Sequence, residues 1–186
     1  MLQSASQPVR RLPGIVALAM RPLPLFPLQI ALERLLAGIL ARHPDLIGRL
    51  SEIERRRIAI EPDDLPFVII LEPLRGTMSL RLVRTLEREH VHARIRGPLP
   101  VLTGLVDGLY DGDALFFSRD LVVEGDIEAV LALRNAIDDA DVDLVAEISE
   151  TCAAFGPPIG GLKEAIARIL RSVISGAGGA GARPLQ

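Results

Sequence analysis

Apolar and polar positions alternate between residues 120 and 124, and this alternation is the sharpest local signal in the chain. Leu121 and Val123 take one side, while Asp120, Val122 and Glu124 take the other. A period of two is typical of a half-buried strand. Gly125-Asp126 follows, and aspartate is a preferred helix N-cap. Apolar residues then recur at helical spacing, at Ile127, Val130, Leu131 and Ile137. The pattern predicts a strand that passes directly into an amphipathic helix.

The remaining elements follow from the same two periodicities. Helical stripes predict helices at Leu28–Arg42, Asp45–Arg55, Leu99–Leu109, Val142–Phe155 and Leu162–Ser175. Alternation bounded by turn residues predicts strands at Arg57–Glu61, Phe67–Leu71, Met78–Val83 and His90–Arg96. The short spacing of these strands predicts an antiparallel meander.

These elements predict an α+β fold, with a mainly antiparallel five-stranded sheet covered by amphipathic helices and extra helices at both ends. The chain of 186 residues suits one core of ordinary size. We expect a proline-rich apolar arm over 1–27, a single domain over 28–175 and a flexible glycine-rich tail over 176–186. The tail matches G-x-G-x-x-G, but a helix rather than a strand precedes it, which excludes a dinucleotide site there.

Composition indicates an aliphatic interior. Hydrophobic residues make up 49% of the chain, yet aromatic residues make up only 3% and tryptophan is absent. Such an interior suits either a dense core or the lining around a hydrocarbon chain. Cys152 is the sole cysteine, so no disulfide forms within the chain, and a reducing, cytoplasmic setting is the simpler choice. Its position on an apolar helix face favours a core role over a nucleophilic one.

Charge is unevenly distributed along the chain. Residues 1–57 carry nine arginines and four acidic residues, a net charge of +5, and the remainder carries −8, which together give −3. A basic, apolar arm favours an anionic membrane surface over nucleic acid, because stacking aromatics are absent. Helix-end arginines on a solvated face are the alternative. The expected membrane contacts are Arg10, Arg11, Ile15, Leu18, Arg21, Leu25 and Phe26.

The apolar run of the arm suits neither a signal peptide nor a membrane span. Pro13-Gly14 breaks it early and Arg21 ends it, so secretion is the less favoured interpretation. No stretch reaches the roughly 18 apolar residues that a membrane span needs. We therefore expect a cytoplasmic protein with peripheral contact at the inner membrane.

Candidate catalytic and metal-binding groups are few. His90 and His92 share a strand face, but Arg94 and Arg96 continue that face and would repel a cation, so a solvated basic strip is the preferred interpretation. The acidic run over 138–143 lacks the spacing and central glycine of a calcium loop. We predict no catalytic residue, no metal and no cofactor.

The segment Leu115–Asp126 carries a family resemblance. Its order of Phe116-Phe117, a short polar link, an alternating strand, Gly-Asp and a helix resembles the closing part of the sterol carrier protein 2 lipid-binding fold. Within that superfamily it is most similar to the UbiT family, the accessory factors of oxygen-independent ubiquinone biosynthesis. The resemblance extends weakly back to His90–Arg96. It implies a non-catalytic protein that holds a prenylated quinone precursor or phospholipid for enzymes of ubiquinone biosynthesis.

Three functions are therefore weighed. The first is lipid binding in an apolar cavity between the sheet and the helices. The second is an acyl or prenyl transfer enzyme, for which few nucleophiles and bases are available. The third is a structural adaptor that docks partners through the acidic stretch over 107–150. The expected cavity lining consists of Leu35, Ile39, Leu80, Leu82, Ala93, Ile95, Leu102, Leu105, Phe116, Phe117, Leu121, Val123 and Val130.

Overall fold

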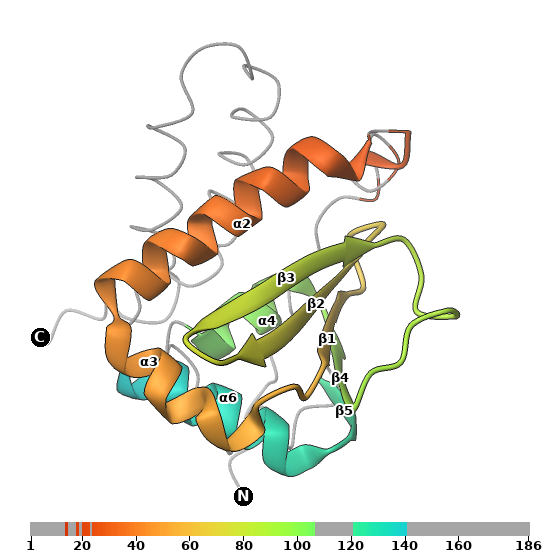
Figure 1. Ribbon diagram of the computed structural model, residues 1–186. Coiled ribbons are helices and arrows are strands. Elements are labelled where there is room, and N and C mark those ends of the chain that lie inside the picture. Colours follow the sequence, from red (N-terminus) through yellow and green to blue (C-terminus); the bar gives the residue numbers. More distant parts are fainter. Residues whose placement is uncertain (1–13, 15–17, 19, 23, 107–120, 141–186) are drawn as a thin grey trace, which may run out of the picture.

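One five-stranded sheet carries helices on one of its faces (Figure 1). The computed structural model describes residues 14, 18, 20–22, 24–106 and 121–140. The expected α+β class, with a mostly antiparallel sheet, is confirmed. The predicted helices over 142–155 and 162–175, and the tail over 176–186, lie outside the described residues. The elements are α2 (Leu25–Arg42), α3 (Pro44–Arg49), the 3-10 helix η1 (Leu50–Ile53), β1 (Ile58–Pro62), β2 (Val68–Leu74), β3 (Thr77–Val83), β4 (Ala93–Gly97), α4 (Leu99–Val106), β5 (Val122–Gly125) and α6 (Ile127–Asp139).

The strand order corrects the predicted meander. The order is β3-β2-β1-β4-β5, so β4 lies beside β1 rather than beside β3. The β1/β4 pair is parallel, and the other three pairs are antiparallel. Two hydrogen bonds fix the start of β4 beside β1: His92 N donates to Arg57 O over 2.8 Å, and Arg57 N donates to Nδ1 of His92 over 3.0 Å. The chain from β1 to β4 contains a whole hairpin, which makes it long enough for a parallel connection.

The register divides the sheet into an apolar inner face and an outer face that combines charged residues with buried apolar ones. Side chains alternate between the faces along each strand, and paired residues share a face. The inner face consists of Ile58, Ile60, Ile69, Leu71, Met78, Leu80, Leu82, Ala93, Ile95 and Val123. The outer face carries the charged residues Glu61, Glu72, Arg81, Arg94, Arg96 and Glu124, and it also includes Ala59, Val68 and Ile70, which are buried. The alternation predicted for Leu121 to Glu124 agrees with this, since Leu121 is buried and Val122 is exposed.

Helix α2 lies along the edge strand β3 (Figure 1). The side chain of Gln29 accepts a hydrogen bond from the backbone N–H of Leu82 over 3.4 Å, which covers part of that open sheet edge. The helix begins at Leu25, three residues earlier than predicted. Pro24 is its N-cap and Pro27 lies in its first turn, where a missing N–H breaks no helical hydrogen bond.

Helix α6 packs its small residues inward. Asp126 is its N-cap as predicted, with Oδ1 accepting from Ala129 N over 3.1 Å. The buried face is Ala129, Val130, Leu133 and Ala136. The predicted face was partly wrong, because Ile127 is 54% and Leu131 39% exposed. The two alanines on the buried face suit a close approach of α6 to η1 and β4, which it contacts, while Ile127 and Leu131 lie on the outward side.

Candidate functional site

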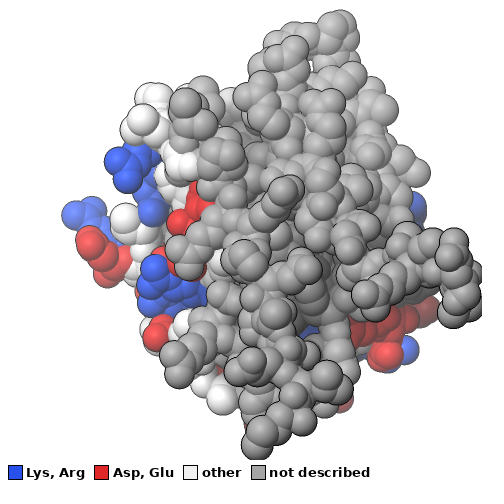
Figure 2. Space-filling model, turned by 180° about the vertical axis from the view of Figure 1, so that it is seen from behind, with Lys and Arg blue, Asp and Glu red and all other residues white. Residues whose placement is uncertain are grey.

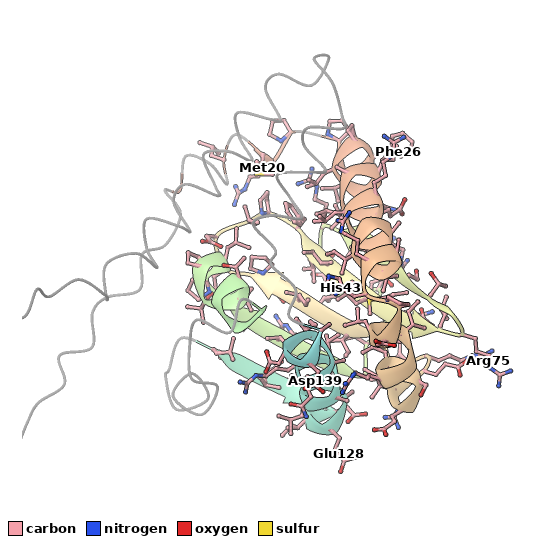
Figure 3. The ribbon with its side chains drawn as sticks, turned by 90° about the vertical axis from the view of Figure 1, so that its left-hand side faces the viewer. Met20, Phe26, His43, Arg75, Glu128 and Asp139 are labelled. Carbon is pink, nitrogen blue, oxygen red and sulfur yellow. The ribbon has the colours of Figure 1, made fainter. Side chains whose placement is uncertain are left out.

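The apolar inner face and the helices in front of it bring most of the predicted cavity residues together. Figure 3 views the sheet from the helix side, with α2 and α4 at its two flanks and α6 at the lower end. Ten of the thirteen predicted residues have described side chains. Leu80, Leu82, Ala93, Ile95 and Val123 share the inner face, and Leu35, Ile39, Leu102, Leu121 and Val130 are buried in or packed against the core beside it. Phe116, Phe117 and the side chain of Leu105 lie outside the described residues.

The predicted residues fall into two groups by burial. Ile39, Leu82, Ala93, Ile95, Leu102, Leu121 and Val130 are buried. Leu35, Leu80 and Val123 are only half-buried. Full burial is what dense packing requires, whereas a half-buried residue on an inner face still offers surface to another molecule.

A group of half-buried apolar residues extends this second set across the middle of the sheet. Ile60 of β1 and Ile69 and Leu71 of β2 belong to the inner face, yet none is fully buried. Leu36, next to Leu35 on α2, is also half-buried and packs against the core. These strands lie between β3, which α2 covers, and β4, which α4 contacts. We call Leu35, Leu36, Ile60, Ile69, Leu71 and Leu80 the inner strip.

Four of the six residues of the inner strip were not predicted from the sequence. Leu36, Ile60, Ile69 and Leu71 stand in the predicted helix and strands but were not assigned to the lining. Apolar residues recur every second position in three strands: Ile58 and Ile60 in β1, Ile69 and Leu71 in β2, and Leu80 and Leu82 in β3. The alternation in β1 and β2 was therefore the signal that would have found them.

The outer face is an array of ion pairs rather than a solvated basic strip. Arg94 of β4 contacts Glu61 of β1 over 2.6 Å and Glu124 of β5 over 3.2 Å, so one guanidinium joins three strands. Arg57 and Glu72 form a further pair over 3.0 Å. Figure 2 shows acidic and basic side chains intermixed on the described surface seen from behind. The predicted strip is wrong because neighbouring strands supply carboxylates that sequence spacing does not reveal.

A pocket of about 370 Å³ lies beside the β1–β2 turn. Its polar lining combines Arg21, Arg84 and Arg96 with Glu61 and Asp63, and its apolar lining includes Leu65, Phe67 and Val68. Nε of Arg96 donates to Oδ1 of Asp63 over 2.6 Å. This hydrogen bond, together with the negative charges of Asp63 and Glu61, raises the pKa of Arg96 above its usual value. This pocket could not be predicted from local sequence patterns, because its arginines come from three distant segments.

The expected membrane contacts that are described lie around the start of α2. Leu18 is 63% and Phe26 73% exposed, Arg21 is exposed, and Leu25 is half-buried. Arg10, Arg11 and Ile15 lie outside the described residues. Among the described helices, none is long and apolar enough to cross a membrane. Within the same part of the chain, no group of three His, Cys, Asp or Glu residues could hold a metal ion.

Comparison with known proteins agrees with this geometry. The sequence model of the SCP-2 sterol transfer family matches residues 32–138. Among solved structures, a protein described as UbiJ-SCP2 ubiquinone synthesis protein is similar with a TM-score of 0.55 and 24% identity, covering 65% of this chain and 98% of that protein. Sterol carrier protein 2 from Yarrowia lipolytica, in its apo form, has a TM-score of 0.43 and 12% identity, covering 59% of this chain and 88% of that one. A search of curated proteins gives no match. The matched region spans more than half of the chain and contains the whole described sheet, and the chain therefore belongs to the SCP-2 sterol transfer family.

Proposed function

We propose that this protein is a non-catalytic lipid-binding protein, and that the inner strip contacts its ligand. The observation that carries the proposal is the inner face itself. Its ten sheet positions on five strands are all apolar, and half of them are only half-buried, namely Ile60, Ile69, Leu71, Leu80 and Val123. An apolar surface without polar groups suits a hydrocarbon chain, which offers nothing to hydrogen bond. The family to which the chain belongs points in the same direction.

The proposed ligand is a prenylated quinone precursor or a phospholipid. The resemblance of Leu115–Asp126 to ubiquinone accessory factors supports this class, as does the name of the similar UbiJ-SCP2 ubiquinone synthesis protein. The protein would then hold its ligand for partner enzymes of the ubiquinone pathway, in the cytoplasm or at the inner membrane surface. In this role it needs no nucleophile, metal or cofactor.

Lipid extraction from the purified full-length chain tests the proposal. We expect native mass spectrometry to show one bound lipid per chain, and solvent extraction followed by mass spectrometry to identify it. Leu80→Trp places a larger side chain on the inner strip and should lower lipid occupancy at least severalfold. Ser79→Trp is the matched control, because Ser79 is the exposed neighbour on the outer face of the same strand.

Two results would contradict the proposal. One is a lipid-free extract from protein purified without detergent. The other is an equal loss of lipid in Leu80→Trp and Ser79→Trp at unchanged melting temperature, which would place the ligand away from the inner strip.

A further inference from the structure

The outward face of α6 carries two apolar residues that no described element covers. Ile127 is 54% and Leu131 39% exposed, and they lie one turn apart on the same side of the helix. The opposite side of the helix, which faces the core, includes Ala129 and Ala136. An amphipathic helix usually turns its larger apolar residues inward and its polar ones to water. Helix α6 therefore presents an apolar pair where polar residues are expected.

Contacts at both ends of α6 keep this face turned outward. At its start, Asp126 accepts from Ala129 N over 3.1 Å, and its second carboxylate oxygen pairs with Arg56. At its end, Asp139 pairs with Arg49 of α3. The buried side of α6 packs against α3 and η1, which lie just before Arg56 in the chain. A face that is already held in place loses little conformational entropy when a partner binds it.

Glu128 adds an uncompensated negative charge to this face. Five acidic residues stand between 122 and 139, and four of them have arginine partners. These four pairs are Glu124 with Arg94, Asp126 with Arg56, Asp138 with Arg134 and Asp139 with Arg49. Glu128 has no cationic partner among the described residues. It is exposed, and Figure 3 shows it pointing away from the molecule at the lower end of α6. Since Leu131 follows three residues later on the helix, the charge lies beside the apolar pair.

These features favour one kind of occupant over two others. An anionic lipid surface would be repelled by Glu128. A second copy of this chain, paired about a two-fold axis, would bring two uncompensated Glu128 carboxylates into one small interface. A helix with two apolar side chains one turn apart and a lysine or arginine beside them would cover the apolar pair and neutralise the carboxylate.

We propose that the outward face of α6 docks a basic amphipathic helix of a partner protein. Ile127 and Leu131 contact the apolar side chains of that helix, and Glu128 pairs with its lysine or arginine. The face lies on the side of α6 that is turned away from the core, so it does not depend on which ligand occupies the inner strip. It gives a position to the docking role considered for the acidic stretch over 107–150.

The test measures binding of a synthetic helix to the full-length chain by fluorescence anisotropy. The probe is a labelled peptide of about 18 residues, or five helical turns, with leucines along one face and lysines beside them. A second probe has the same leucines and carries glutamate in place of every lysine. We expect the lysine probe to bind at least tenfold more tightly than the glutamate probe, and added salt should weaken its binding.

Variants of the chain locate the binding face. Leu131→Ser should lower the affinity for the lysine probe about tenfold, and Glu128→Gln about threefold. Phe26→Ser and Glu87→Gln are the matched controls, because they change an exposed apolar residue and an exposed acidic residue far from α6 in the chain. Both controls should bind the probe as the unaltered chain does. All four side chains are exposed, so each variant should keep its melting temperature within about two degrees.

Several results would overturn the proposal. One is equal binding of the lysine and glutamate probes, and another is unchanged binding in Leu131→Ser. Equal losses in Glu128→Gln and Glu87→Gln would indicate attraction by net charge alone. A dimer in sedimentation velocity that Leu131→Ser dissociates would assign the face to a second copy of the chain. Weaker vesicle binding by Leu131→Ser would assign it to a membrane.

Discussion

At the scale of single residues, the backbone at position 125 requires glycine. Its φ is +84°, and a Cβ there would stand 2.3 Å from the carbonyl oxygen of His92. The same oxygen accepts a hydrogen bond from Asp126 N over 2.8 Å, so the backbone cannot move away without breaking it. Gly125 therefore joins the end of β5, the start of β4 and the N-terminus of α6 in one close contact.

Gly125→Ala should lower the free energy of unfolding by about 3 kcal/mol or more, because the left-handed conformation and the steric clash both oppose a methyl group. Gly76→Ala isolates the first effect, since Gly76 has a φ of +73° and open space around it, and should cost about 1 kcal/mol. Gly48→Ala in α3 should cost nothing. Urea denaturation measures all three, and equal losses at 125 and 76 would remove the role assigned to the clash.

The partners of Asp126 could be predicted only in part from the sequence. The sequence predicted Asp126 as a helix cap, and the cap is confirmed. Its other oxygen pairs with Arg56, seventy residues earlier, which no local pattern could indicate. Asp64 lies in the turn between β1 and β2, yet it is buried and its Oδ1 accepts a hydrogen bond from Leu99 N over 3.0 Å at the start of α4. The capping hydrogen bond of Asp126 follows from the local sequence. Its pair with Arg56 and the bond between Asp64 and Leu99 depend on the tertiary structure.

At the scale of elements, β5 tests whether the faces are assigned correctly. Leu121 is buried in the core, so Leu121→Asp would leave a carboxylate unpaired in an apolar setting and should cost several kcal/mol. Val122 is exposed and lies opposite Arg96 in the register. Val122→Glu should therefore be neutral or slightly stabilising, whereas Val122→Lys should cost up to about 1 kcal/mol by facing a like charge.

Thermal melts of these three variants measure their relative stabilities. The expected order of stability is Val122→Glu, then Val122→Lys, then Leu121→Asp. A stable Leu121→Asp protein would mean that the strand faces the other way, and that Val123 does not belong to the inner face.

Element positions and the β1/β2 and β2/β3 pairs were predictable, whereas the partner of β4 was not. Each strand was predicted within a few residues, because alternation is a local signal. The placement of β4 beside β1 was missed, since a period of two contains no information about the neighbouring strand. The connection over 84–92 did carry a hint, being longer than the two to five residues of a usual hairpin loop. Helix α2 was predicted to start too late because its first turn contains a proline, which the N-terminal turn tolerates.

At the scale of the whole molecule, the two ends of the sheet differ in character. The end at the β1–β2 turn combines exposed Leu18 and Phe26 with Arg21 and Arg84. The other end presents Arg75 at the β2–β3 turn and Ile127 at the start of α6. If the first end faces a membrane, exposed apolar residues should contribute to membrane binding at that end only.

Phe26→Ser should therefore weaken binding to phosphatidic acid vesicles about tenfold, because inserting a phenyl ring contributes roughly 1.5 to 3 kcal/mol. Ile127→Ser is the matched control: Ile127 also lies in the first turn of a helix and is exposed, but beside Glu128 at the far end (Figure 3). Neither change should alter the melting temperature by more than about two degrees, since both side chains are largely in solvent. Equal vesicle binding by Phe26→Ser and Ile127→Ser would show that the start of α2 faces something other than a bilayer. Loss of binding by Phe26→Ser alone would place the apolar residues and the arginine-lined pocket on one membrane-facing end.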